Sequence, residues 1–290
     1  MRVISGEARG HTLKAPKGMT TRPMSDKIKG ALYSMLSGLL DSSEREWGYV
    51  LDMYAGSGSI GIEALSRGAT WADFVEVNAG VCRVISDNLE HTKFGERARV
   101  NNRNVAAFLN HPPGSPTATA NKRTVGGLHR RKGGKHRDQL DISEVVSPPL
   151  DSVIATPVMN VSLVSENEQL ASQELWQYDI IFLDPPYADP KIPQTIEQVA
   201  RSGLVRPGGL VVIGHSPRVK LAQTYGSPEA DKTGALLLNL LRYRRHGDSA
   251  FSIYIGGDPA AYGFDTDISA EEADTDFASG DENGEDAEGE

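Results

Sequence analysis

Apolar residues recur along the chain with two different spacings, which separate helices from strands. Between residues 28 and 40 they recur every three or four positions, which predicts a helix capped by Ser25. Compact apolar runs predict strands at 49–53, 71–77, 99–101, 178–183 and 209–214, with helices at 59–66, 80–92 and 190–202. Strands alternating with helices indicate parallel pairing through right-handed crossovers, and hence a layered α/β sheet.

The two ends of the folded part show a different pattern. Short strand-like runs at 2–5 and 11–15 flank a turn that contains Gly6 and Gly10, which predicts a small hairpin. A second pair of apolar runs, 236–243 and 250–255, is joined by a short turn-rich link. This pair predicts a hairpin, so the mostly parallel sheet should end with an antiparallel strand.

Four regions follow from these patterns. Residues 1–45 form an N-terminal extension of hairpin and helix, and residues 46–110 with 177–257 form the α/β domain. Between them, residues 111–176 are rich in Pro, Ser, Thr and Gly and lack sustained periodicity, which predicts a disordered insertion. Residues 258–290 read as a disordered acidic tail.

Charge is distributed unevenly. The net charge of −9 includes 13 acidic and no basic residues after position 257, so residues 1–257 carry 30 basic and 26 acidic side chains. Residues 1–30 hold seven basic side chains against two acidic ones. Such a face could contact phosphates, or it could be a solvated surface.

Cysteine content and apolar run length indicate the compartment. Cys82 is the only cysteine, so no intramolecular disulfide can form, which suits a reducing environment. The longest apolar runs fall far short of the roughly 20 residues of a membrane helix. We therefore expect a cytoplasmic protein without membrane contact.

A glycine-rich segment joins the strand at 49–53 to the next helix, with glycines at 56, 58 and 61. Glycines let a ligand approach the backbone closely, and the helix N-terminus offers free N–H groups. Glu76, at the end of the next strand, stands where a carboxylate would bind ribose hydroxyls. A nicotinamide dehydrogenase and an S-adenosyl-L-methionine enzyme would both use this pattern, so the segment alone leaves the two open.

A second motif, Asp184-Pro185-Pro186-Tyr187, follows the apolar strand at 178–183 and favours the second class. An exocyclic amine of adenine or guanine is a poor nucleophile because its lone pair is delocalised into the ring. The Asp184 carboxylate and the Pro185 carbonyl could accept both of its N–H groups and stabilise the growing positive charge. Tyr187 offers a ring on which the base could stack. Asp184, Pro185 and Tyr187 are therefore the catalytic candidates.

Together the two motifs resemble amino-methyltransferases that act on nucleic-acid bases. More narrowly, Val3-Ile4-Ser5-Gly6, the segment 21–29 and the run 61–69 resemble the RsmD-type 16S ribosomal RNA guanine-N2 methyltransferases. The resemblance covers roughly residues 1–110 and 177–256. It implies a Rossmann-like class I methyltransferase fold.

The resemblance also implies site residues. The cofactor contacts would come from Asp52, Gly56, Ser57, Gly58, Glu76 and Asn104. Asp52 would support the loop or the cofactor's amino group, and Asn104 would contact the adenine ring. The RNA contacts would come from Arg9, Arg22, Lys27 and Lys29.

The sequence thus predicts an enzyme that methylates the 2-amino group of a guanine in small-subunit ribosomal RNA. Its expected partner is ribosomal RNA or the assembling small subunit, and it is expected to be a monomer that needs no metal. Two alternatives remain: an adenine 6-amino methyltransferase acting on DNA or RNA, and a non-catalytic RNA-binding assembly factor with the same fold.

Overall fold

The computed structural model describes residues 1–16, 24–43, 45–114, 176–186, 189–227 and 236–264. They fall in one compact unit, formed by Met1–Ser115 and Leu175–Glu290. Most of the predicted insertion lies outside the described residues, as do Arg22 and Tyr187.

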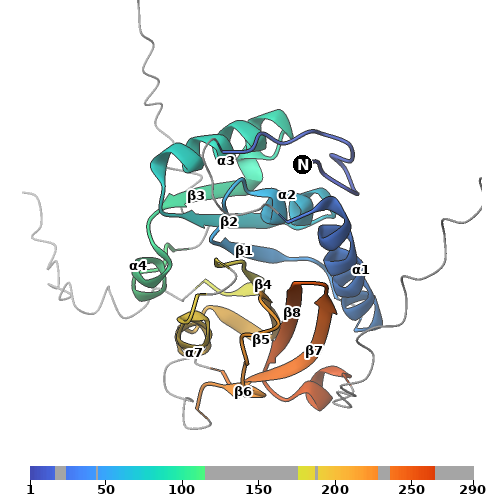
Figure 1. The fold of residues 1–290 in the computed structure, drawn as a ribbon, viewed down its shortest axis with the longest axis vertical. Helices are drawn as coiled ribbons and strands as arrows, with labels where there is room; N and C mark the ends of the chain where they lie inside the picture. Colours follow the sequence, from blue (N-terminus) through green and yellow to red (C-terminus); the bar gives the residue numbers. More distant parts are fainter. Residues whose placement is uncertain (17–23, 44, 115–175, 187–188, 228–235, 265–290) are drawn as a thin grey trace, which may run out of the picture. The chain divides into compact units, whose positions relative to one another are not determined.

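An eight-stranded sheet organises this unit, in the order β3-β2-β1-β4-β5-β8-β7-β6 (Figure 1). Its strands are β1 (Tyr49–Met53), β2 (Trp71–Glu76), β3 (Ala98–Asn102), β4 (Tyr178–Leu183), β5 (Val205–His215), β6 (Thr224–Tyr225), β7 (Leu238–His246) and β8 (Ser249–Gly256). β1 to β5 pair in parallel, and β8 runs antiparallel to both β5 and β7. The predicted mostly parallel sheet with an antiparallel C-terminal hairpin is confirmed.

Helices cover both faces of the sheet (Figure 1). The helices α1 (Asp26–Ser42), α2 (Ser59–Ser66) and α3 (Ala79–His91) pack on one face, and α4 (Val105–Asn110) and α7 (Ile192–Arg201) pack on the other. Short 3-10 helices are η1 (Gly95–Arg97) and η3 (Pro259–Tyr262). Each face carries its own buried apolar cluster, so the sheet is the middle of three layers. No helix in the described ranges is long and apolar enough to cross a bilayer.

Several elements differ from the predictions in their boundaries, and one helix was missed. The helix expected at 190–202 begins at Ile192, because Asp189 accepts a hydrogen bond from the Lys191 amide at 2.9 Å and forms a turn first. β5 begins four residues early, at Val205, which pairs with Tyr178 across an irregularity in register. The six-residue helix α4 was not predicted, because so short a helix shows little periodicity.

Residues 258–264, which the sequence assigned to the acidic tail, belong to the described part of the fold. Asp258 caps η3 by accepting a hydrogen bond from the Ala260 amide at 3.1 Å. Phe264 is buried in the cluster that contains α1 and α2, and Tyr262 packs against it. Because the segment is mostly polar, its sequence did not indicate that Tyr262 and Phe264 pack in the core, so the predicted boundary at 258 was wrong.

Residues 1–16, called the arm below, lie along α2. The predicted hairpin is confirmed as one antiparallel bridge, Arg2 with Thr12, flanked by a 3.0 Å bond from the Val3 amide to the His11 carbonyl. The Glu7 amide donates to the Ser66 carbonyl at 2.7 Å. The arm is thereby attached to the helix that follows the glycine-rich segment.

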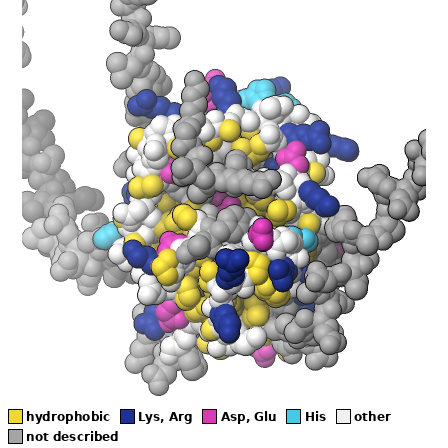
Figure 2. Space-filling model, viewed as in Figure 1, with side chains coloured by type: hydrophobic (Ala, Val, Ile, Leu, Met, Phe, Trp, Pro, Cys, Tyr) yellow, Lys and Arg dark blue, Asp and Glu magenta, His cyan; other side chains and the backbone are white. Residues whose placement is uncertain are grey.

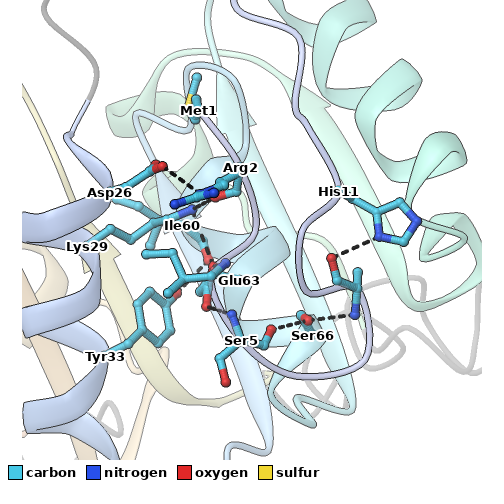
Figure 3. A network of polar contacts seen from close by, with 12 residues as sticks. Met1, Arg2, Ser5, His11, Asp26, Lys29, Tyr33, Ile60, Glu63 and Ser66 are labelled. Carbon is cyan, nitrogen blue, oxygen red and sulfur yellow. Dashed lines mark hydrogen bonds and ion pairs between the residues drawn. The ribbon is translucent and has the colours of Figure 1, made fainter.

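A buried carboxylate, Glu63 of α2, fixes the arm and α1 together (Figure 3). Its two oxygens accept from the Ile4 amide at 2.7 Å and the Ser5 amide at 3.0 Å. Lys29 of α1 lies 3.3 Å from the same carboxylate and donates to the Arg2 carbonyl at 2.7 Å. Arg67 pairs with Glu63 at 2.9 Å.

This arrangement corrects the prediction that Lys29 contacts RNA. The Lys29 side chain is 1% exposed, and its ammonium lies inside the protein against Glu63 and the arm. Burial lowers its pKa, and the Glu63 carboxylate opposes that shift. Lys29 is therefore a structural ion-pair partner rather than a surface contact.

Candidate active site

The glycine-rich segment forms a tight loop between β1 and α2. Tyr54, Gly56 and Gly58 all have positive φ angles, of 62°, 55° and 76°. At Gly61, in the first turn of α2, an added Cβ would lie 2.4 Å from the Phe74 ring. Glycine is therefore needed at position 61 for close packing of the helix on β2, and at 56 and 58 for backbone conformation.

Asp52, near the end of β1, supports this loop from behind. The residue is buried, and its Oδ2 accepts a hydrogen bond from the Gly61 amide at 2.9 Å. Its Oδ1 has no partner among the described residues. Burial raises the pKa of this carboxyl well above its usual range.

Glu76 and Asn104 stand at the ends of the neighbouring strands β2 and β3. Glu76 accepts from the Gly56 amide at 3.1 Å and from the Asn78 amide at 2.8 Å, so it holds the glycine loop against β2. Asn104 caps α4 by accepting from the Ala107 amide at 2.7 Å. Both side chains thus accept hydrogen bonds from backbone amides, and both residues also line the cavity described below.

Asp184 follows β4 directly, and β1 and β5 flank that strand. Its amide lies 3.5 Å from the Met53 carbonyl of β1. Its Oδ1 is buried without a partner in the described part of the chain. An added Cβ at Gly214 of β5 would lie 2.6 Å from that oxygen, so the absence of a side chain at Gly214 makes room for the carboxylate. Burial raises the pKa of Asp184 to about 6.

A cavity of about 280 Å³ joins these elements at the carboxyl edge of the sheet. It is lined by Met1, Pro16, Met24, Tyr54, Ala55, Gly56, Ser57, Ser59, Ile60, Val75, Glu76, Val77, Arg103, Asn104, Val105, Asp184, Pro185 and Pro186. Of the predicted cofactor and catalytic residues, it brings together Gly56, Ser57, Glu76, Asn104, Asp184 and Pro185. Asp52 of β1 and Gly58 of the loop do not line the cavity.

Several lining residues were missed from sequence. Met1 and Pro16 come from the arm, and Met24 lies two residues before α1; all three are far from the loop in sequence. Tyr54 carried a usable signal, because it directly follows a buried strand in the motif. Its left-handed backbone is uncommon for a residue with a side chain, and such strain concentrates at functional sites.

Two of the predicted RNA contacts lie at the surface, and Arg22 is outside the described residues. Arg9 of the arm and Lys27 of α1 are exposed, whereas Lys29 is not. On the face drawn in Figure 2, Lys and Arg side chains occur at several separate places.

The strand order and the loop define the class of the protein. Five parallel strands ordered 3-2-1-4-5, extended by an antiparallel hairpin, carry a glycine loop after β1 and an acidic residue, Glu76, at the end of β2. This is the fold of the class I methyltransferases, as the sequence predicted. A solved structure of the Escherichia coli protein yhhF has the same fold, with a TM-score of 0.54, 21% identity, and coverage of 89% of this chain and 98% of that one.

The family can be stated as well. The family model described as Conserved hypothetical protein 95 matches residues 1–119 and 145–248, and the chain belongs to this family of RsmD-type methyltransferases. The chain is 28% identical to the Bacillus subtilis protein YlbH, over 78% of this chain and 88% of that protein. It is 36% identical to ribosomal RNA small subunit methyltransferase D of Escherichia coli (strain K12), over 38% of this chain and 52% of that protein.

Proposed function

We propose that this protein transfers a methyl group from S-adenosylmethionine to the 2-amino group of a guanine in small-subunit ribosomal RNA. The observation that carries the proposal is the cavity, in which the glycine loop, Glu76 and Asp184 meet. The name of the Escherichia coli relative, ribosomal RNA small subunit methyltransferase D, supports the choice of RNA.

The cavity suits S-adenosylmethionine. Methionine, isoleucine and valine side chains line it and offer an apolar surface for an adenine ring and a thioether-like chain. Glu76 would accept from the ribose hydroxyls, and Ser57 would lie beside the methionine portion. When bound, the cofactor would supply a methyl group on a positively charged sulfur; as the amine takes this methyl group, the carbon–sulfur bond would break, S-adenosylhomocysteine would leave, and the amine would give up one proton.

Asp184 and Pro185 would act on the amine. The buried Asp184 Oδ1 has no partner among the described residues, so this acceptor is available for an N–H group of a base. With the Pro185 carbonyl accepting the other N–H, the nitrogen lone pair would turn from the ring toward the methyl carbon. The carboxylate would also stabilise the positive charge that grows on the nitrogen. Tyr187 remains a predicted stacking platform, outside the described residues.

The test is methyl transfer with the purified chain, isotopically labelled S-adenosylmethionine, and small-subunit ribosomal RNA, naked or in the subunit. Digestion to nucleosides followed by mass spectrometry should show labelled N2-methylguanosine. Labelled N6-methyladenosine would contradict the proposed base. Absence of label from both substrates, with the cofactor bound, would favour the non-catalytic assembly factor.

The rate of methyl transfer should depend on pH through Asp184. Its pKa of about 6 reflects burial, and only the ionised form accepts both the hydrogen bond and the developing charge. Under single-turnover conditions the rate should therefore fall about tenfold per pH unit below pH 6 and level off above it. A flat profile between pH 5 and 8, in a protein that stays folded, would contradict this role.

Gly214→Ala should impair catalysis while leaving the cofactor site intact. The backbone of Gly214 is not in the left-handed region, so alanine suits the strand, but its Cβ would lie 2.6 Å from Asp184 Oδ1. The carboxylate must move, and a displacement of about 1 Å can cost about 10²-fold in rate. The matched control is Gly38→Ala in α1, where an added Cβ meets no atom within 4 Å. Equal single-turnover rates for the two variants would contradict the prediction.

A further inference from the structure

The arm reaches the cavity as well as α2. Met1 and Pro16, at its two ends, both line the cavity. The Ser57 hydroxyl of the glycine loop lies 3.3 Å from the Met1 sulfur, to which it donates. In Figure 3, Met1 lies at one end of the network that Glu63 holds together. The arm is thus continuous with one wall of the cavity.

A second buried side chain, Asn88 of α3, joins the arm to the same loop. Its Nδ2 donates to the Ser57 carbonyl at 2.9 Å and to the Lys14 carbonyl at 3.0 Å. Its Oδ1 accepts from the Lys14 amide at 2.8 Å. Asn88 is 1% exposed, so these bonds are shielded from water. The Asn88 side chain therefore fixes the distance between the glycine loop and Lys14, which lies two residues before Pro16 in the arm.

Glu63 and Asn88 hold the arm at separate places. Glu63 binds the Ile4 and Ser5 amides, which lie three and four residues after Met1. Asn88 binds Lys14, which lies two residues before Pro16. Neither Glu63 nor Asn88 lines the cavity, so each would affect a ligand there through the elements that it holds in place. Because a buried amide that loses its partner costs about 1–3 kcal/mol, removal of either should loosen the arm.

We propose that the arm is a wall of the methyl-donor site, and that Asn88 is a positioning residue that sets the site's width by binding Lys14 and Ser57 at once. The proposal rests on the proposed function for the identity of the ligand. It gives residues 1–16 a role in cofactor binding, in place of a role confined to RNA contact. Cofactor affinity should therefore depend on a side chain that never touches the cofactor.

The first experiment is calorimetric titration of the full chain with S-adenosylhomocysteine. Asn88→Ala should weaken binding about tenfold, which corresponds to about 1.4 kcal/mol. The matched control, Asn239→Ala, removes a side-chain amide that donates to the Gly257 carbonyl at 2.8 Å, on β7 and away from the cavity. Its affinity should equal that of the wild type, and a thermal unfolding curve should accompany each variant.

The second experiment needs no substitution. In the wild-type chain, hydrogen exchange at the Ile4, Ser5 and Lys14 amides should slow at least severalfold when S-adenosylhomocysteine binds. A purely structural arm would show the same exchange with and without the ligand, and that result would overturn the proposal.

The outcomes separate this proposal from the proposed function. A wild-type chain that fails to bind S-adenosylhomocysteine would overturn both. Binding by the wild type with unchanged affinity in folded Asn88→Ala would overturn the arm's role alone. Weaker binding in Asn88→Ala, with ligand-dependent protection of the arm in the wild type, would support it.

Discussion

Asp184→Asn should lower the rate of methyl transfer to RNA by about 10²–10³-fold, the usual cost of removing one preorganised charge-stabilising group. Asparagine keeps the size of the side chain but carries no negative charge to balance the charge that develops on the amine. Because the substitution changes only the base-facing side of the cavity, affinity for S-adenosylhomocysteine should change by less than about threefold. Single-turnover rates and calorimetry measure the two quantities.

The same variant should be more stable than the wild type at pH 8. The pKa of Asp184 is about 6 in the folded state, above its ordinary value of 3.8. The folded state thus binds more protons than the unfolded state between these values, and stability falls as pH rises through that window. Removing the charge should raise the free energy of unfolding by about 1–3 kcal/mol at pH 8.

The control for both measurements is Asp248→Asn, at the exposed turn between β7 and β8. It should change neither the rate nor the stability. An Asp184→Asn variant that retains full activity would contradict the catalytic role. A variant that loses activity together with stability would indicate a structural carboxylate instead.

Glu63→Ala should lower the free energy of unfolding by about 3–5 kcal/mol, because removing one member of a buried ion pair leaves its partner uncompensated. Lys29 is 1% exposed and Arg67 15%, and both point at the Glu63 carboxylate. The Ile4 and Ser5 amides would also lose their acceptor. Urea unfolding followed by circular dichroism measures the change.

Two further variants make this prediction specific. Asp87→Ala removes an exposed ion pair with Lys14; the Asp87 side chain is 53% exposed and the Lys14 side chain 67%. This variant should lower the free energy of unfolding by less than about 0.5 kcal/mol. Combining Glu63→Gln with Lys29→Met removes the buried charges of both Glu63 and Lys29, leaving the half-buried Arg67, and should recover part of the stability. A Glu63→Ala variant as stable as Asp87→Ala would contradict the network's importance.

Lys29 illustrates a limit of reading charge from sequence. It lies three residues before Leu32 and seven before Leu36, on the stripe that α1 buries. That position was the available signal, but a basic residue in a basic segment suggested the surface. Only the tertiary structure supplies the buried Glu63, 34 positions away, that makes burial of the ammonium favourable.

The sequence by itself determined the alternation of the main strands and helices along the chain, though not α4 or β6, and the functional residues near the strand ends. In a parallel α/β sheet the carboxyl ends of the strands share one edge, so Gly56, Glu76 and Asp184 could be expected to meet there. β1, α2 and β4 have the predicted boundaries. For α2 and β4 the end is marked by a polar residue, because Arg67 follows α2 and Asp184 follows β4.

The tertiary structure decided which distant residues complete the site. Gly214 makes room for Asp184 because β5 pairs with β4 in a register that sets Ile213 beside Leu183. Met1 and Pro16 reach the cavity because Glu63 and Asn88 bind the arm's backbone. Such contacts join residues that are far apart in the chain, and they depend on packing geometry rather than on local spacing.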